Sequence, residues 1–179
     1  MTTTIITASL NGFRAALDKV GAEMLDAARP AAYDGSDVLL EEVQKNFSKY
    51  PIMGGKDNTL YKALYRVFAR RSQDGVPIYD VGVNMRKAPH WHLIEYGHWR
   101  YYAAKKLPNG DWVTLKRKGA KGKKPPQKAS KAVKDAYYIP LKTPVWVPAR
   151  PYLRPAKEAL PKALAAARKT FLERIRAKR

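Results

Sequence analysis

The feature that most constrains this chain is a stripe of apolar residues near its start, repeating at alternating steps of three and four. The stripe consists of Leu10, Phe13, Leu17, Val20 and Met24. Leu40, Val43 and Phe47 repeat the pattern further along the chain. This spacing places the apolar side chains on one face of a helix, which predicts a long amphipathic scaffold helix packed on a sheet.

Two features predict a break in this helix. Pro30 interrupts the pattern, and so does the segment Asp34–Ser36. Ser36 can cap a second helical stretch, with Asp37 in its favourable first turn. The stretch should end near Tyr50, because a residue before proline avoids helical backbone angles. We therefore expect a kinked or two-part helix over residues 10–49.

Short β-rich segments flank this helix. Thr3–Ser9 is rich in β-branched residues and predicts a short strand, while Pro51–Asn58 is typical of a loop. Residues 60–70 and 76–84 are expected to form a β-hairpin across the turn sequence SQDG. The alternative is a helix over 59–71, because Lys62, Arg66 and Arg70 also recur at steps of four.

The segment KAPHWHLIEYG predicts a short central helix. Ala88-Pro89 is expected to open it, since proline is acceptable at the first helical position. Gly97 is expected to close it as a left-handed cap.

The last part of the chain combines a hairpin, a basic linker, strands and a helix. Asn109-Gly110 is typical of a hairpin turn. Residues 119–134 are rich in Lys, Gly and Pro, and are expected to be mobile or ordered only against a partner. The expected sheet residues downstream are Tyr137, Ile139, Val145 and Val147. A final helix should begin at Pro155, with Pro161 fraying or delaying its start. Its apolar side is Leu160, Leu164, Phe171 and Ile175.

Together these elements predict an α+β fold with one small, mostly antiparallel sheet. The sheet is packed by the long N-terminal helical region, the short central helix and the C-terminal helix. We expect a single domain over residues 1–179, with a basic hairpin and loop inserted at about 99–136.

Charge is distributed unevenly along the chain. The net charge is +20, but residues 1–50 carry five Lys or Arg against seven Asp or Glu. Residues 99–136 carry twelve basic residues against two acidic ones, and residues 154–179 carry nine against two. This asymmetry indicates contact with a polyanion or an acidic protein surface.

Several classes of protein are disfavoured. The chain has no cysteine, which excludes disulfides, thiolate metal sites and a cysteine nucleophile. No stretch approaches the roughly 20 apolar residues of a membrane span, and the first residues do not resemble a signal peptide. The sequence lacks the helical HExxH, nucleophile-elbow, phosphate-loop and dinucleotide fingerprints. We therefore expect neither an enzyme nor a bound cofactor.

One histidine-rich segment could hold a metal. His90, His92, Glu95 and His98 are close in sequence, and residues 92 and 95 share a helical face. Gly97 is expected to end the helix and turn His98 away, while His90 and His92 point in different directions. We expect packing or hydrogen-bonding histidines and no metal site. Glu41-Glu42 is interpreted in the same way, as the solvated face of a helix.

Three interpretations of the basic insert stay open. Its cations are Lys116, Arg117, Lys118, Lys121, Lys123 and Lys124, interleaved with Tyr101, Tyr102, Trp112, Tyr137 and Tyr138. Such a segment could bind nucleic acid, with phosphates on the cations and bases on the rings. It could equally face an acidic protein, or act as a solvated spacer. A basic, non-sequence-specific nucleic-acid-binding protein is the alternative functional hypothesis.

Two ordered segments resemble a known family. The first is Leu93, Ile94, Glu95, Tyr96 and Gly97, and the second is Pro151, Tyr152, Leu153, Arg154, Pro155 and Ala156. This pair resembles the neck proteins of tailed bacteriophages, which join head to tail or complete the tail. The resemblance spans nearly the whole chain except the 99–136 insert. His98 stands where the family often has Thr.

The resemblance implies a structural virion protein at the head–tail junction, made in the host cytoplasm. It implies that copies of the chain form a ring, expected to be six-fold, around the channel through which DNA passes. The implied partners are the portal, adaptor or head-closure proteins and the tail-tube proteins, with packaged DNA in the channel and no membrane. Within the fold, Leu93, Ile94 and Tyr96 would dock the short helix on the sheet. Glu95 would pair with an arginine such as Arg150 or Arg154.

Overall fold

The chain folds into two compact units. The computed structural model describes residues 2–50, 55–73, 75–126 and 128–178, with the side chains of the first helix described from Lys19 onward. One unit, here the helical unit, comprises Met1–Glu42, Tyr65–Gly82 and Ala156–Arg179. The other, here the ribbon unit, comprises Val43–Leu64 and Val83–Pro155.

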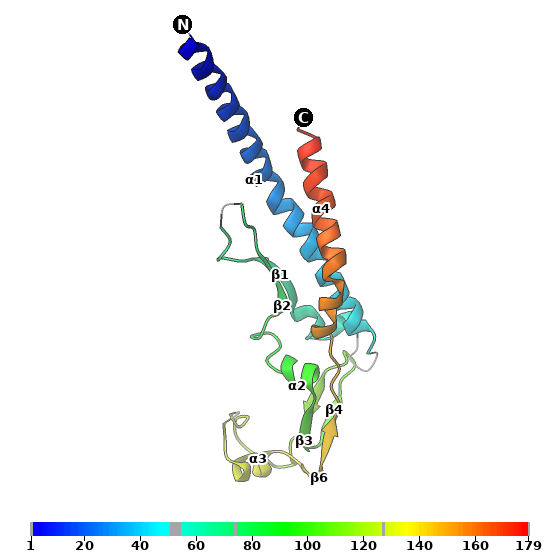
Figure 1. The fold of residues 1–179 in the computed structure, drawn as a ribbon. Coiled ribbons are helices and arrows are strands. Elements are labelled where there is room, and N and C mark those ends of the chain that lie inside the picture. Colours follow the sequence, from blue (N-terminus) through cyan, green and yellow to red (C-terminus); the bar gives the residue numbers. More distant parts are fainter. Residues whose placement is uncertain (1, 51–54, 74, 127, 179) are drawn as a thin grey trace. The chain divides into compact units, whose positions relative to one another are not determined.

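The long N-terminal helix is continuous (Figure 1), so two predictions are wrong. Helix α1 runs from Thr2 to Ser48 with Pro30 inside it, and it includes the segment 3–9 expected to be a strand. Pro30 removes only one backbone hydrogen bond, which a long helix tolerates. Ser36 does not cap a second helix, because its hydroxyl donates to the carbonyl of Tyr33 one turn back, at 2.7 Å.

The helical unit is held together by small residues between α1 and the C-terminal helix α4, Leu160–Arg176. The two helices lie side by side in Figure 1. Gly35 lies so close to α4 that an added Cβ would be 2.9 Å from the carbonyl oxygen of Ala163. The Thr170 hydroxyl donates to Asp34, and Lys178 pairs with Asp26. The buried alanines of the unit are Ala27, Ala31, Ala156, Ala159 and Ala163, with Ala69.

This close approach replaces the packing expected from the leucine pattern. Leu160 and Leu164 are 47% and 69% exposed, whereas Ala163 is 5% exposed. On α1, Val20 and Met24 are also exposed, at 38% and 46%. Helices with small residues at their contact approach closely, and the large apolar residues of each helix are then left on other faces. The apolar side identified from the sequence is therefore not the buried face of α4 at Leu160 and Leu164.

Replacing Gly35 with alanine should destabilise the helical unit. The new methyl group would overlap a backbone oxygen of α4, so the helices must separate. We expect a loss of about 1–3 kcal/mol in unfolding free energy. Gly21→Ala is the matched control, because nothing lies within 4 Å of that position. In a helix that change should add about 0.5–1 kcal/mol. Thermal unfolding followed by circular dichroism measures both, and equal effects would contradict the close packing.

The predicted hairpin is confirmed and packs on α1 within the helical unit. Strands β1, Leu64–Phe68, and β2, Tyr79–Val83, form a two-stranded sheet, so the alternative helix over 59–71 is wrong. Only Tyr61–Ala63 is helical there, as a single 3-10 turn. Arg66 of β1 pairs with Asp37 of α1, and its guanidinium lies over the ring of Tyr33 at 3.6 Å.

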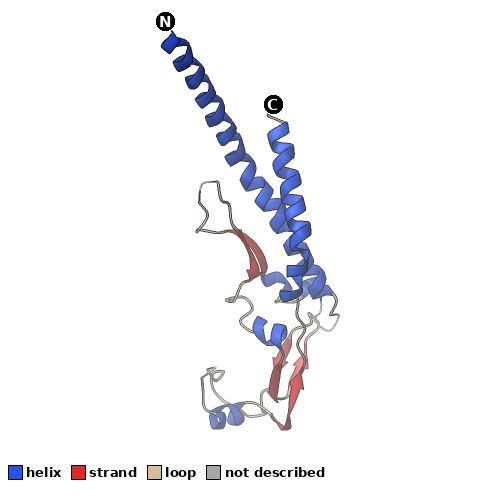
Figure 2. Ribbon diagram, in the orientation of Figure 1, coloured by secondary structure: helices blue, strands red, loops and turns tan. Residues whose placement is uncertain are grey.

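The ribbon unit contains two further antiparallel ribbons (Figure 2). Strand β3, His98–Tyr102, pairs with β6, Pro140–Val147, and Trp99 lies opposite Trp146. Strand β4, Ala104–Lys106, pairs with β5, Trp112–Thr114, across the predicted Asn109-Gly110 turn. The α+β class is confirmed, with the small antiparallel sheets arranged as three two-stranded ribbons.

Some predicted strand residues lie elsewhere. Val145 and Val147 are in β6, but Tyr137 ends helix α3, Lys131–Tyr137, and Ile139 precedes β6. Ser130 caps α3 by accepting from the backbone N–H of Val133. The segment 119–134, expected to be mobile or ordered only against a partner, therefore ends in a capped helix.

The core of the ribbon unit gathers around the end of α1. Phe47 packs edge-on against Tyr61 and Tyr152, with ring centroids at 5.5 and 5.6 Å. The other buried apolar residues are Val43, Leu60, Ala63, Val83 and Ala88. The predicted stripe through Val43 and Phe47 is confirmed, and α1 ends at Ser48 as expected. Gly55–Asp57 of the predicted loop forms a 3-10 turn, while 51–54 lie outside the described residues.

The C-terminal helix begins in two stages. Arg154–Ala159 forms a 3-10 helix, η4, and α4 starts at Leu160 with Pro161 in its first turn. The predicted delay at Pro161 is confirmed, because proline lacks the N–H that a helix interior needs.

No helix in the described part of the chain is both long and apolar enough to cross a membrane.

Candidate functional site

The central helix α2, Trp91–Tyr96, is positioned by a turn at Asn84. The Asn84 side chain accepts from the backbone N–H groups of Arg86 and Lys87, and its carbonyl accepts from Ala88. The helix begins after His90, so Pro89 precedes it and does not occupy its first position. The predicted short helix is confirmed with a later start.

Gly97 ends α2 in a conformation that other residues rarely adopt. Its φ is 77° and its ψ is 166°, so the cap is not the left-handed helical one that was predicted. The positive φ turns the chain directly into β3. A Cβ at this position would lie 2.9 Å from the backbone atoms Ala149 N and Val147 O, and from the ring of Trp146. Only glycine fits this turn without displacing the backbone.

Glu95 is the central residue of the site. It is 1% exposed, although it is charged and lies on a short helix. Its Oε2 accepts from the backbone N–H of Tyr152 at 2.9 Å and of Leu153 at 3.2 Å. Its Oε1 accepts from the backbone N–H of Arg154 at 2.9 Å. A buried carboxylate that receives three successive N–H groups fixes the segment Tyr152–Arg154 against α2. We call this arrangement the carboxylate clamp.

Arg154 completes the clamp from its exposed side. Its Nε donates to Glu95 Oε1 at 3.3 Å, and its terminal nitrogen donates to the Glu95 carbonyl at 2.9 Å. The guanidinium also lies 4.7 Å from the ring centre of Tyr96. The predicted Glu95–Arg154 pairing is thus confirmed. Arg150 is not the partner, and only its backbone N–H takes part, donating to Ile94 at 2.8 Å.

The other residues of the two motif segments differ in how deeply they are buried. Leu93 and Ile94 are half-buried, but Tyr96 is 56% exposed and stacks beneath Arg154. Tyr96 therefore does not dock α2 on a sheet. In the second motif, Pro151–Ala156, the Tyr152 side chain is fully buried. The Pro151 carbonyl accepts a hydrogen bond from the Tyr50 hydroxyl at 3.5 Å.

The buried position of the clamp and its negative charge change the pKa of Tyr152. Burial, and then the negative charge of Glu95, raise the pKa of the Tyr152 hydroxyl far above its usual range. That hydroxyl is buried and has no hydrogen-bond partner among the described residues. It stays protonated, and the ring acts as an apolar wedge against Phe47. Sequence reasoning missed this orphan hydroxyl, and no pattern in the sequence signals it.

The histidines beside the clamp do not converge. His98 Nδ1 lies 3.1 Å from the carbonyl of Leu93, and His92 is exposed. Burial lowers the pKa of His90, which favours its neutral form. In the part of the chain that the structure describes, no three His, Asp or Glu side chains lie close enough to hold a metal ion. Glu95 is occupied by the clamp.

The basic insert is tied to the end of the β3–β6 ribbon by backbone hydrogen bonds. Ala103 N–H donates to Ile139 at 2.8 Å, Leu115 N–H donates to Ala103 at 2.7 Å, and Ile139 N–H donates to Leu115 at 3.2 Å. These three hydrogen bonds link the three residues in a cycle, and we call this set of bonds the insert knot. The sequence gives no signal for it, because the three residues are unremarkable apolar groups far apart in the chain.

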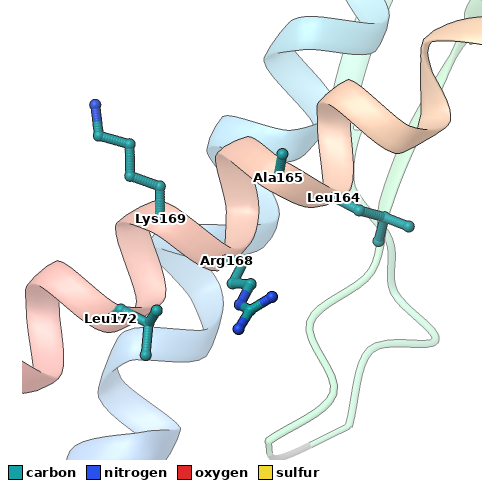
Figure 3. Close-up of a pocket in the computed structure, with 5 residues that line it drawn as sticks. All are labelled: Leu164, Ala165, Arg168, Lys169 and Leu172. Carbon is teal, nitrogen blue, oxygen red and sulfur yellow. The ribbon is translucent and has the colours of Figure 1, made fainter.

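Two large apolar patches are exposed, one in each unit. The aromatic patch, in the ribbon unit, comprises Trp99, Tyr101 and Trp146, which are 54%, 54% and 48% exposed. The leucine patch, in the helical unit, comprises Leu160, Leu164 and Leu172, which are 47%, 69% and 40% exposed. Leu164, Arg168, Lys169 and Leu172 line an open hollow on α4, and Figure 3 shows these side chains on the helix. Exposed apolar side chains that are grouped in this way are candidate contact surfaces for other molecules.

The chain was compared with protein-family models, curated proteins and solved structures, and none of them matches it.

Proposed function

We propose that this chain is a structural virion protein of a tailed phage, forming a closed ring at the head–tail junction. The carboxylate clamp carries the proposal. The two segments on which the resemblance to phage neck proteins rests are 57 residues apart at Glu95 and Tyr152, and the clamp bonds them directly. The clamp supports the proposal because it joins, within one fold, the two segments that carry the resemblance.

The exposed patches support assembly from copies of one chain. A closed ring needs two different surfaces on each copy, because each subunit meets its neighbours head to tail. The leucine patch and the aromatic patch differ in composition and lie on different units. We expect a six-fold ring in which the leucine patch of one copy contacts another copy. In the virion it would connect the portal, adaptor or head-closure proteins to the tail-tube proteins.

The ring proposal predicts that charges placed on either patch prevent assembly. Leu164→Glu and Trp99→Glu should each lower the association constant at least about tenfold, because each buries a charge in the subunit contact. Met85→Glu is the control, since Met85 is 66% exposed and belongs to neither patch. Sedimentation velocity over a range of concentrations, with and without tail-tube protein, gives the association state. A protein that stays monomeric in both conditions would contradict the proposal.

A further inference from the structure

The basic insert presents its cations on an anchored scaffold. The insert knot joins Ala103, Leu115 and Ile139, and Arg117 N–H donates to Tyr137 at 3.0 Å. The loop after Arg117 turns back through the Ala120 N–H, which donates to the Arg117 carbonyl at 3.2 Å. Gly119 and Gly122 adopt positive φ with open space around them. Helix α3, which Ser130 caps, lies beyond this loop (Figure 2), so hydrogen-bonded structure is present on both sides of the basic segment.

The positive charge of this scaffold is not neutralised within the described part of the chain. Its two carboxylates are already engaged: Asp111 accepts from Thr59 and Asn109, and Asp135 accepts from Tyr102 and Lys131. The hydrogen bond from Lys131, followed by the one from Tyr102, lowers the pKa of Asp135. The remaining exposed lysines form no ion pair with a described residue. They are Lys105, Lys106, Lys116, Lys118, Lys121, Lys123, Lys124 and Lys128.

The side chains of this surface suit phosphate groups better than they suit nucleic-acid bases or an apolar protein surface. Tyr102, Tyr137 and Tyr138 pack against one another, with ring centroids at 5.5 and 5.0 Å, so their rings are partly engaged within the insert, while Tyr101 and Trp112 stay about half exposed. Lys116 lies 5.1 Å from the centre of the Tyr137 ring. Between residues 116 and 128 the only apolar side chain besides two prolines is that of Ala120. A protein interface usually has an apolar core, and the segment from 116 to 128 lacks one.

We propose that this surface binds the phosphate backbone of double-stranded nucleic acid, without reading its sequence. A duplex carries one negative charge per about 1.7 Å of its axis, which suits closely spaced lysines on flexible stems. Arg117 is held in place by its Nε, which donates to the Tyr138 carbonyl at 3.2 Å. The inference deepens the proposed function by naming a partner, and rests on that function only for where the contact occurs: DNA in the channel of the ring.

A salt titration tests the surface directly. The purified full chain is titrated with a fluorescent duplex of about 30 base pairs at several salt concentrations. Replacing Lys118, Lys121, Lys123 and Lys124 together with glutamine should weaken binding roughly 10–100-fold at low salt. The slope of log K against log salt should fall in magnitude by about 3–4, since each phosphate contact contributes about 0.9. These side chains are exposed, so an unchanged melting temperature should accompany the loss.

The control removes the same charge elsewhere. Lys157, Lys162, Arg174 and Arg176 are exposed residues of η4 and α4, and their replacement with glutamine should change the affinity less than about threefold. Equal losses in both variants, or unchanged binding in the insert variant, would overturn the proposal. So would tighter binding to the single strand than to the duplex, or equally effective competition by polyglutamate of matched charge. None of these results bears on whether the chain is present in virus particles, so the two proposals fail separately.

Discussion

Glu95→Ala should lower the unfolding free energy of the ribbon unit by about 3–5 kcal/mol, because it leaves three backbone N–H groups without an acceptor. One of those groups, on Tyr152, is fully buried, and the carboxylate itself is 1% exposed. Water therefore cannot replace the lost bonds without opening the packing around Phe47. All four tryptophans, Trp91, Trp99, Trp112 and Trp146, lie in the ribbon unit, so urea unfolding followed by their fluorescence reports this loss.

Two comparisons isolate the clamp from ordinary effects of charge. Glu158→Ala removes an exposed carboxylate of η4 and should change stability by less than about 0.5 kcal/mol. Arg154→Ala removes a guanidinium that is half exposed, so its ion pair is screened by solvent and its loss should cost about 1 kcal/mol. If Glu95→Ala unfolded as easily as Glu158→Ala does, the carboxylate clamp would not be what holds the two motifs together.

Gly97→Ala should destabilise the same unit by about 3–4 kcal/mol. Part of the loss comes from backbone strain, since φ of 77° with ψ of 166° is a region essentially restricted to glycine. The rest comes from overlap, because the new methyl group would lie 2.9 Å from backbone atoms of Val147 and Ala149. Neither strand end can move away without breaking the pairing of His98 with Val147. Urea unfolding with tryptophan fluorescence again measures the change.

Gly119→Ala provides the comparison for strain without overlap. Gly119 has a φ of 81°, but nothing lies within 4 Å of its added Cβ. The substitution should therefore cost only about 1 kcal/mol. Similar losses at Gly97 and Gly119 would mean that the close approach of β6 to the end of α2 contributes little.

The clamp was partly predictable because the sequence places a carboxylate between apolar residues. Glu95 lies between apolar neighbours on a short helix, so a buried carboxylate there requires a cationic or N–H partner. The expected partner was an arginine such as Arg150 or Arg154, and in the structure it is Arg154. The sequence could not identify the three backbone donors, because their direction depends on how the chain turns after Pro151, which no side-chain pattern encodes.

The two long helices show that hydrophobic periodicity predicts a helix but not which of its faces is buried. The leucine spacing of α4 correctly predicted a helix, but not which of its faces would be covered. Gly35 and Ala163 allow a closer contact than leucines permit, and this contact decided the packing. The strand expected at Thr3–Ser9 and the break at Pro30 both relied on local propensity, which a long helix overrides. The insert knot depends on three backbone bonds between distant residues, and local patterns carry no information about such bonds.

We propose that this chain is a component of the virus particle at the head–tail junction. Gold-labelled antibodies against the chain, applied to purified tailed-phage particles from the source of the sequence and imaged by electron microscopy, test this most directly. The account predicts label confined to the junction, with several copies per particle, as a ring requires. Particles that carry no label there, although the antibody recognises the purified chain in its folded form, would contradict it.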